Sequence, residues 1–318
     1  MNLIKEILSQ KELVDKPPVL IDIGASGNIH SKWKKFATYS VCIAFDADDR
    51  EFGFITKAAS GYLKLHVFNC IVTNKEDESI PFFLTKSPYC SSALKPRSEK
   101  LTEYAFFDKF EVDKVVNLKN ISLSQALKKL DIDYVDWFKT DSQGIDLRLF
   151  DNLDPAISRN VIAAEFEPGI IDSYSGEDKL YSLFQYMDGK PFWLADITIK
   201  GSQRISKETL DSLSNSNILR KLLYFSLKTS PGWAETLYLN DFSELSLKRQ
   251  YLLGWVFSTL NSQHGFSLSI AKKGNELFHE KIFERMISYS KRRIFFNLLK
   301  LKFFPSVVIK LRKLFNQD

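Results

Sequence analysis

The sequence predicts an α/β fold built around a mostly parallel sheet, and three observations support this fold class. Short apolar runs rich in β-branched and aromatic residues alternate with segments of helical pattern. The first run, Val19–Ile21, leads into the glycine turn of residues 24–27. Several runs end in acidic residues, namely Asp22, Asp46, Asp141, Glu165 and Glu167. Strands that alternate with helices form parallel sheets, which bind ligands beyond the carboxyl ends of their strands.

The expected elements follow in order along the chain. Residues 1–16 are charged throughout, which is typical of a short surface helix and not of a signal peptide. Strands are expected at residues 19–22, 40–45, 63–72, 79–84, 114–118, 133–139, 160–166, 192–197 and 236–239. Helices are expected at 121–130, with Ser122 as N-cap, and at 177–187. We therefore expect an N-terminal helix (1–16), a domain (17–242), a helical extension (243–289) and a basic tail (290–318).

Composition narrows the class of protein. A chain of 318 residues that is 44% hydrophobic can bury one large core. Three widely spaced cysteines and four histidines show no disulfide or metal-ligand spacing. No apolar run approaches the roughly 18 residues that a membrane-spanning helix needs, so we expect a cytoplasmic protein. Residues 291–318 hold eight basic residues and one acidic residue, whereas the rest holds 36 basic and 38 acidic residues. This distribution argues against a nucleic-acid-binding protein.

The glycine turn indicates a nucleoside cofactor with a cationic group. Glycines let backbone amides approach a ligand, and Asp22 adds a negative charge that a pyrophosphate would not favour. The cofactor that fits is S-adenosylmethionine (SAM). Asp46, about 20 residues further on, suits the hydroxyls of a ribose in either SAM or NAD. The turn is not G-x-G-x-x-G, which makes a dinucleotide the weaker alternative, and a strand–turn–helix without a ligand is the other.

Several further motifs, in order, resemble the FkbM-type SAM-dependent methyltransferase family. They are DIGASGN at residues 22–28, FDAD at 45–48, YCSSALKP at 89–96, WFKTDSQGIDLRLFDNL at 137–153, AAEFEPG at 163–169 and WAETLYL at 233–239. The resemblance covers roughly residues 18–239. It implies a class I methyltransferase fold with a seven-stranded α/β sheet. It also implies O-methylation, often of sugar hydroxyls in glycans or natural products. The remaining possibilities are an NAD-dependent oxidoreductase and a non-catalytic interaction module.

Two positions depart from the pattern of that family. The family often has Glu at the end of the second strand, where this chain has the shorter Asp46. It often has an acidic residue before the glycine of the lysine–aspartate segment, where this chain has Gln143. The second departure puts more weight on Asp141.

The candidate cofactor residues come from the ends of the first three strands. Asp22 is expected to stabilise the methionine end of SAM, with backbone access provided by Gly24, Ala25, Ser26 and Gly27. Asp46 and Ala47 are expected beside the ribose. Cys70 and Ile71 are candidates for the adenine wall, although Cys70 would equally suit a small buried core position.

The candidate catalytic residues come from the next two strands. Methyl transfer to oxygen needs alignment and a general base, for which Asp141 is the first candidate and Glu165 the second. Lys139 could orient Asp141, contact the substrate or form a structural ion pair. An Asp141–Glu165 pair could also hold Mg²⁺. Ser91 and Ser92 are candidates for contact with a hydroxylated acceptor, and solvated loop serines are the plain alternative.

The C-terminal tail, residues 290–318, mixes basic and apolar residues. Val307, Leu311 and Leu314 share one helical face, and Pro305 is expected to divide the tail into two short helices. This pattern is typical of a segment in peripheral contact with the surface of an anionic membrane. It is equally typical of a helix that packs on the protein and keeps its lysines in water.

Overall fold

The computed structural model describes residues 2–25, 29–48, 61–74, 79–299 and 310, and the chain divides into two compact units. The larger unit comprises Leu13–Leu245, and the smaller one combines Met1–Glu12 with Ser246–Asp318. The larger unit contains the sheet that the sequence predicts, whereas the described elements of the smaller unit are helices.

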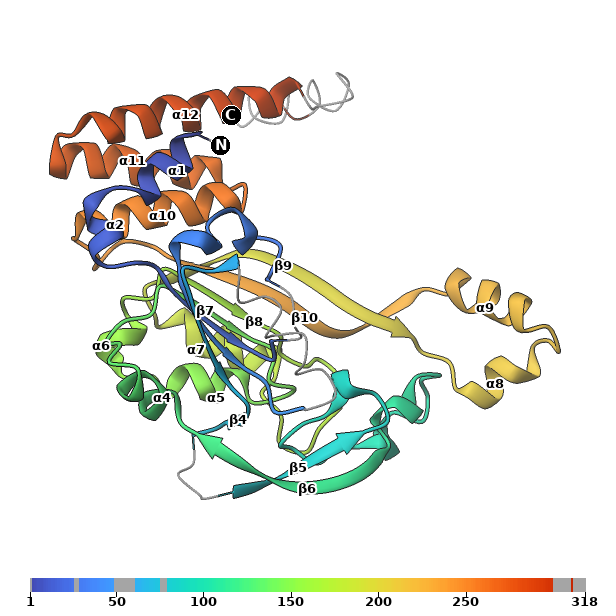
Figure 1. The fold of residues 1–318 in the computed structure, drawn as a ribbon. Coiled ribbons are helices and arrows are strands. Elements are labelled where there is room, and N and C mark those ends of the chain that lie inside the picture. Colours follow the sequence, from blue (N-terminus) through green and yellow to red (C-terminus); the bar gives the residue numbers. More distant parts are fainter. Residues whose placement is uncertain (1, 26–28, 49–60, 75–78, 300–309, 311–318) are drawn as a thin grey trace. The chain divides into compact units, whose positions relative to one another are not determined.

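The central sheet of the larger unit has seven strands in the order β3-β2-β1-β7-β8-β10-β9 (Figure 1). Five of them run parallel to one another: β3 (Lys64–Phe68), β2 (Val41–Phe45), β1 (Val19–Ile23), β7 (Trp137–Thr140) and β8 (Ala163–Phe166). β10 (Thr229–Asn240) runs antiparallel to β8 and to β9 (Phe192–Gln203). The predicted α/β fold with a mostly parallel, Rossmann-like sheet is therefore confirmed.

A buried core lies on one face of this sheet, against α4 (Leu123–Lys129), α5 (Asp146–Asp151) and α7 (Leu180–Asp188). Because successive side chains in a strand point to opposite faces, Ile21 and Ile23 of β1 belong to this core while Asp22 lies on the other face. α6 (Pro155–Ser158) lies between α5 and β8 in the chain. On the other face, Trp137 contacts Trp33 of the 3₁₀ turn η1 (Trp33–Lys35) and Phe36, which lies between η1 and the next 3₁₀ turn, η2 (Ala37–Tyr39).

A second sheet of three strands has the order β4-β6-β5, with β4 (Ile71–Val72), β6 (Val112–Ile121) and β5 (Ser79–Thr85). The expected single strand over residues 63–72 is wrong, because the chain leaves the central sheet after Phe68 and Ile71 pairs with β6 instead. Between β5 and β6 lie three 3₁₀ turns, η4 (Pro88–Cys90), η5 (Ser98–Lys100) and η6 (Phe107–Phe110).

The local signal at Ser122 is confirmed as a capping box at the start of α4. The Ser122 hydroxyl accepts a hydrogen bond from the Gln125 backbone N–H, and the Gln125 side chain accepts one from the Ser122 backbone N–H. Two orphan donors of the first helical turn are thereby satisfied.

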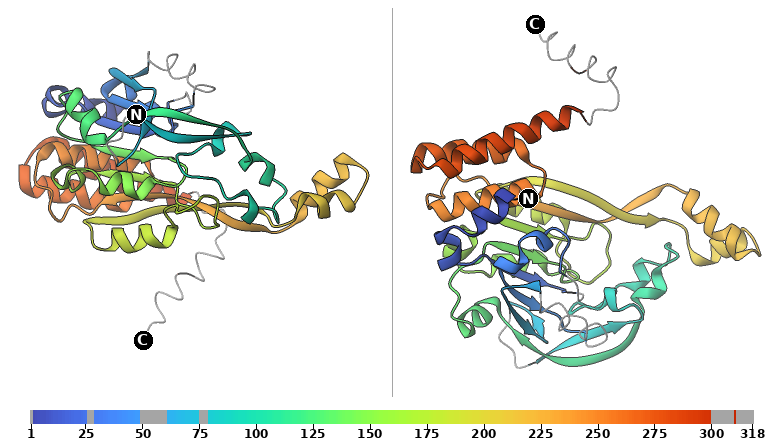
Figure 2. Two further views of the ribbon diagram at one scale, coloured as in Figure 1. Left: turned by 90° about the horizontal axis from the view of Figure 1, so that it is seen from below. Right: turned by 45° about the horizontal axis from the view of Figure 1, so that its top comes forward.

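β9 and β10 form an arm that the sequence does not predict in full. The expected strands at 192–197 and 236–239 cover only part of these two strands, which have twelve residues each. The arm leads to α8 (Lys207–Ser212) and α9 (Asn217–Ser226), which lie away from the central sheet in the views of Figures 1 and 2. The end of β9 that lies toward α8 contains the polar residues Lys200 and Ser202. The alternation of apolar and polar residues that predicts a strand is therefore missing there.

In the smaller unit, α1 (Asn2–Leu8) contacts α10 (Lys248–Leu260), which is followed by α11 (His264–Phe278) and α12 (Lys281–Leu299). Ile7 and Leu8 are buried, and Glu6 forms an ion pair with Arg285. The N-terminal segment, which continues as α2 (Lys11–Asp15), is thus not merely a surface helix.

α12 continues without a break across residue 290, where the basic tail was expected to begin. Ser290 is fully buried and accepts a hydrogen bond from the indole N–H of Trp255 at 2.9 Å. Residues 300–318 of the tail, apart from Lys310, lie outside the described residues, and these include Pro305, Val307, Leu311 and Leu314. In the described part of the chain, no helix combines the length and the apolar character needed to cross a membrane.

Candidate functional site

The strand order of the central sheet reverses between β1 and β7, and the ends of β1, β2 and β7 meet there. The Gly24 backbone N–H donates to the Phe45 carbonyl oxygen, and the Asp141 N–H donates to that of Ile23, both at 3.0 Å. The carboxyl ends of strands at such a reversal form the crevice in which open α/β sheets bind ligands.

Gly24 has a positive φ of 76°, and a Cβ there would lie 2.3 Å from the carbonyl oxygen of Asp141. The glycine is therefore required for the close packing of the ends of β1 and β7, in addition to any approach of a ligand. Ala25 is buried and lines neither of the two clefts described below, while Ser26 and Gly27 lie outside the described residues.

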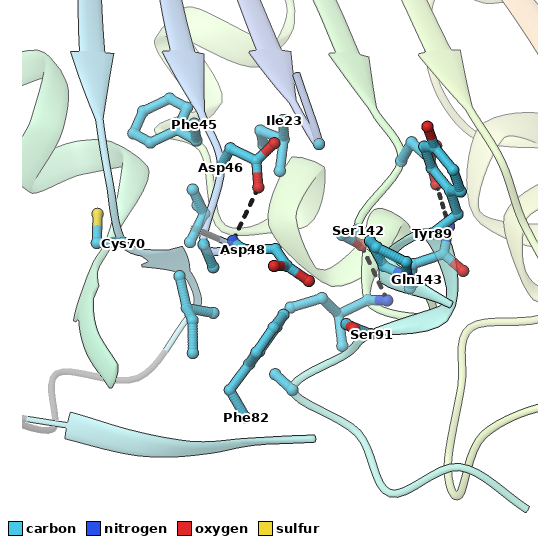
Figure 3. A pocket seen from close by; sticks show the side chains of 18 residues that line it. Ile23, Phe45, Asp46, Asp48, Cys70, Phe82, Tyr89, Ser91, Ser142 and Gln143 are labelled. Carbon is cyan, nitrogen blue, oxygen red and sulfur yellow. Dashed lines mark hydrogen bonds between the residues drawn. The ribbon is translucent and has the colours of Figure 1, made fainter. Parts of the chain in front are cut away.

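The first cleft lies between this end of the central sheet and the second sheet (Figure 3). It encloses about 830 Å³, including space open to solvent. Of the candidate residues, it is lined by Gly24, Asp46, Ala47, Cys70, Ile71, Ser91 and Asp141. Apolar side chains of Ile23, Phe45, Val72, Phe82 and Ile145 complete much of its wall.

Asp46 and Asp48 give the first cleft its acidic character. In Figure 3 they lie between Cys70 on one side and Tyr89 on the other. The Asp46 carboxylate accepts a hydrogen bond from the Asp48 backbone N–H at 2.9 Å, which fixes the turn after β2. Asp48 is itself buried, and sequence reasoning did not select it because nothing distinguished it from the other acidic residues of DADD.

The remaining candidate residues around the first cleft differ in exposure and contacts. Burial raises the pKa of the Cys70 thiol to about 11, so this residue is an uncharged thiol at neutral pH. Ser91 lines the cleft and accepts a hydrogen bond from the Thr85 N–H. Ser92 is buried and lines neither cleft; its hydroxyl donates to the Gln143 carbonyl oxygen at 2.7 Å.

Asp22, Lys139 and Glu165 form a row of alternating charge across β1, β7 and β8. The strand register places Lys139 opposite both carboxylates, and its ammonium lies 2.7 Å from Asp22. Burial alone would lower the pKa of Lys139, but Asp22 and the other carboxylates outweigh it and raise the pKa. Glu165 accepts hydrogen bonds from Lys32 and from the Trp137 indole. None of Asp22, Lys139 and Glu165 lines either cleft.

Glu167, not Glu165, is the carboxyl group that hydrogen-bonds to Asp141. Burial, followed by the charge of the other carboxylate, raises the pKa of Glu167, and burial also raises that of Asp141. The pKa of Glu167, about 9, keeps this carboxyl group protonated at neutral pH, so it can donate a hydrogen bond to Asp141. The sequence offered one signal for this residue, an acidic side chain just after the end of β8.

Gln143 connects this carboxyl pair to Tyr174. Its side-chain amide donates a hydrogen bond to Asp141, and its side-chain oxygen lies 2.9 Å from the Tyr174 hydroxyl, which donates to it. Gln143 has a positive φ of 56°, which is uncommon for a residue other than glycine. The left-handed backbone conformation of Gln143 and its two side-chain hydrogen bonds orient the side-chain amide beside Asp141. In the sequence, Tyr174 could stack on a sugar ring, but such an aromatic residue is more often part of the core, so sequence reasoning left it outside the site.

Asp146 holds the loops after β7 and β8 together. Its carboxylate accepts hydrogen bonds from the backbone N–H groups of Ser142, at 2.8 Å, and Glu167, at 2.7 Å, and from the Thr140 hydroxyl. Burial raises its pKa to about 6 against the lowering effect of these donors. This carboxylate therefore positions Glu167 beside Asp141.

A second cleft adjoins the first and shares Tyr89, Asp141 and Gln143 with it. It encloses about 1250 Å³, including space open to solvent. Its lining is rich in aromatic and charged side chains, namely Phe106, Lys109, Phe110, Glu167, Tyr174, Glu177, Tyr224 and Trp233. The indole N–H of Trp233 is buried and has no hydrogen-bond partner among the described residues.

Among the described residues, no group of three or more His, Cys, Asp or Glu side chains is arranged to hold a metal ion. The Asp141–Glu165 pair considered for Mg²⁺ is divided, because Glu165 binds Lys32 and Trp137 while Asp141 binds Gln143 and Glu167.

No protein-family model, curated protein or solved structure matches this chain.

Proposed function

We propose that the protein is a SAM-dependent O-methyltransferase of the class I type that acts on a hydroxyl group of a carbohydrate, glycan or natural-product intermediate. The observation that carries this proposal is the position of Asp141, which lines both clefts. A carboxylate at such a junction can accept a proton from a hydroxyl in one cleft while that hydroxyl faces a cofactor in the other.

The first cleft fits a nucleoside cofactor. Asp46, at the end of β2, presents a carboxylate to ribose hydroxyls, and Ile71 and Phe82 offer apolar surface for a base. The buried Asp48 adds a second carboxylate, which suits a cofactor that carries positive charge. SAM, when bound, supplies an electrophilic methyl group. In this revised assignment Asp22 supports the site through Lys139 from outside the cleft.

The second cleft fits a hydroxylated ring. The rings of Tyr174 and Trp233 offer flat apolar surfaces, and the Trp233 indole N–H is a donor without a partner in the described chain. Gly201 and Gly232 contribute backbone to the lining. Aromatic faces combined with a few polar groups are typical of sites that orient small polar ligands.

The carboxyl pair supplies the general base. Hydrogen bonds from the Gln143 amide and from the protonated Glu167 carboxyl group favour the negative charge on Asp141. Because burial raises the pKa of both carboxyl groups, these pKa values lie closer to neutral pH than the pKa of an exposed carboxyl group. A base whose pKa lies near the working pH favours proton transfer from a hydroxyl. Tyr174 orients Gln143 and keeps its proton at this pH, since burial raises its pKa well above the usual value, so it is not the base.

Calorimetry with SAM and, separately, with NAD tests the cofactor assignment. We expect SAM to bind and NAD not to bind. Binding of NAD alone would favour an oxidoreductase, and binding of neither would favour a non-catalytic interaction module. The acceptor can then be identified as the metabolite or glycan that receives a labelled methyl group.

A matched pair of variants tests the catalytic assignment with that acceptor. Asp141→Asn should leave the affinity for SAM almost unchanged and lower kcat by about 10²-fold or more. Glu165→Gln, whose side chain lies outside both clefts, should keep kcat within a few-fold of the wild type. Full activity of Asp141→Asn at neutral pH would refute Asp141 as the base.

A further inference from the structure

α9 presents an apolar face to solvent at the end of the β9–β10 arm. Ile218, Leu222 and Phe225 are spaced by four and three residues and therefore lie on one side of the helix. Their exposed fractions are 74%, 63% and 74%. Leu213, Leu219 and Leu227 are also exposed, and we call these six residues the arm patch.

Contacts on the opposite side of α9 fix the direction of this face. The Tyr224 hydroxyl hydrogen-bonds to the Ser202 hydroxyl of β9, and Arg220 forms an ion pair with Asp211 of α8 at 3.2 Å. These residues hold the polar side of α9 against the arm. Ile218, Leu222 and Phe225 therefore point away from the rest of the arm, and the arm patch leaves six large apolar side chains exposed to solvent.

The charges around the arm patch are cationic. α9 contains no acidic residue, and neither Lys221 nor Lys228 forms an ion pair with any described residue. Glu208 and Asp211 of α8 are the acidic residues of the two helices, and Asp211 is neutralised by Arg220. An apolar helical face with lysines at its border is the pattern of a helix that lies in the interface of an anionic bilayer.

The same charges disfavour a second copy of the chain as the occupant. A symmetric dimer would bring the same patch of each protomer together, so that Lys221 and Lys228 of both protomers would lie within one interface. Like charges placed together across an interface are costly, whereas anionic lipid headgroups would complement them. The patch also lies on a helix at the end of a projecting arm, which suits insertion into lipid (Figure 2).

We propose that the arm patch docks on the surface of an anionic lipid bilayer, with the apolar face of α9 in the headgroup region. The second cleft includes Tyr224 and Ser202, so one side of that cleft is built by the docking helix and its strand. Docking would thus bring the second cleft to the lipid surface, where an acceptor carried by a lipid could enter. The docking itself does not depend on the proposed methyl transfer.

A fluorescent probe on α9 tests this proposal in the full chain. Phe225→Cys is labelled with an environment-sensitive dye in a background with Cys70→Ser and Cys90→Ser, since Cys42 is buried. The matched control carries the dye at Tyr181→Cys, on α7, where the side chain is 72% exposed. On anionic vesicles, we expect a blue shift and quenching by brominated lipids for the dye at 225 and no change for the dye at 181.

Two further variants separate the patch from other ways of binding. Ile218→Ser with Leu222→Ser should weaken co-sedimentation with anionic vesicles by roughly tenfold or more, because two apolar side chains no longer enter the lipid. Lys221→Glu with Lys228→Glu should weaken binding to anionic vesicles, and this effect should diminish at high salt. All four side chains are on the surface of the arm, so unchanged thermal melting is the control for folding.

Three results would overturn the proposal. The first is that the protein does not bind anionic vesicles at low salt. The second is that it binds while the dye at 225 stays in water, which would place the contact elsewhere, such as residues 290–318. The third is a dimer in sedimentation velocity that Ile218→Ser with Leu222→Ser dissociates, which would identify a second copy as the occupant. None of these results bears on SAM binding, which is measured separately.

Discussion

Lys139→Met would remove the positive charge at the centre of a buried row of carboxylates. The ammonium lies 2.7 Å from Asp22, and the side chains of Lys139 and Asp22 are only 20% and 7% exposed. Without Lys139, the carboxylates of Asp22 and Glu165 remain buried beside an apolar side chain. Removing one partner of a buried ion pair typically costs about 3–5 kcal/mol of the free energy of unfolding. Most proteins of this kind have only about 5–15 kcal/mol in total.

Asp22→Asn should cost less, about 1–3 kcal/mol, because Lys139 keeps its electrostatic attraction to Asp141 and Glu165. In the double variant the two costs should not add. The coupling free energy should be about 1–3 kcal/mol, since each single substitution already removes the same pair. Because the pKa of Lys139 is raised from 10.5, the stabilisation is fully present below that pH and is lost only at higher pH.

Urea unfolding followed by circular dichroism measures these differences, and urea is preferred since it does not screen charges. Additive costs, or a loss below about 1 kcal/mol for Lys139→Met, would refute the ion pair as a stabilising element. Lys139 would then be a candidate for chemistry again. As a functional control, Asp22→Asn should bind SAM almost normally, whereas Asp46→Ala should lose about 1.5–3 kcal/mol of binding free energy.

Three other predictions concern the site and the termini. Glu167→Leu removes a hydrogen-bond donor that lowers the pKa of Asp141, so that pKa should rise and the acid limb of the kcat profile should move to higher pH by about 1 unit or more; an unchanged limb would contradict the pairing. Gly24→Ala should lower the melting temperature and the affinity for SAM together, because its Cβ would overlap the backbone of Asp141, and wild-type values for both would contradict this. Because Ser290 is buried, the deletion should begin at residue 300 and not at 290, and the protein without residues 300–318 should fold and bind SAM. If this deletion reduces co-sedimentation with anionic vesicles, the tail is supported as a membrane contact, and unchanged binding would count against it.

Local sequence signals determined the positions of most central strands and of the Ser122 capping box. Apolar runs bounded by glycine, proline or acidic residues have few alternatives to a buried strand, and a cap depends on residues only three apart. The acidic ends of β2 and β7 could be predicted for the same reason. Asp46 and Asp141 follow directly from where their strands stop and from the convergence of parallel strands at one edge.

Only the tertiary structure decided which of these side chains meet. Asp22 and Lys139 are 117 residues apart, and nothing local predicts that they bind each other. Glu165 and Glu167 are two residues apart and look alike in the sequence. The strand register directs Glu165 toward Lys139, and Asp146 holds the loop that places Glu167 beside Asp141. Packing and burial therefore decide which of the two glutamates pairs with Asp141, because the charges and hydrogen-bond donors around a carboxyl group set its pKa and its partners.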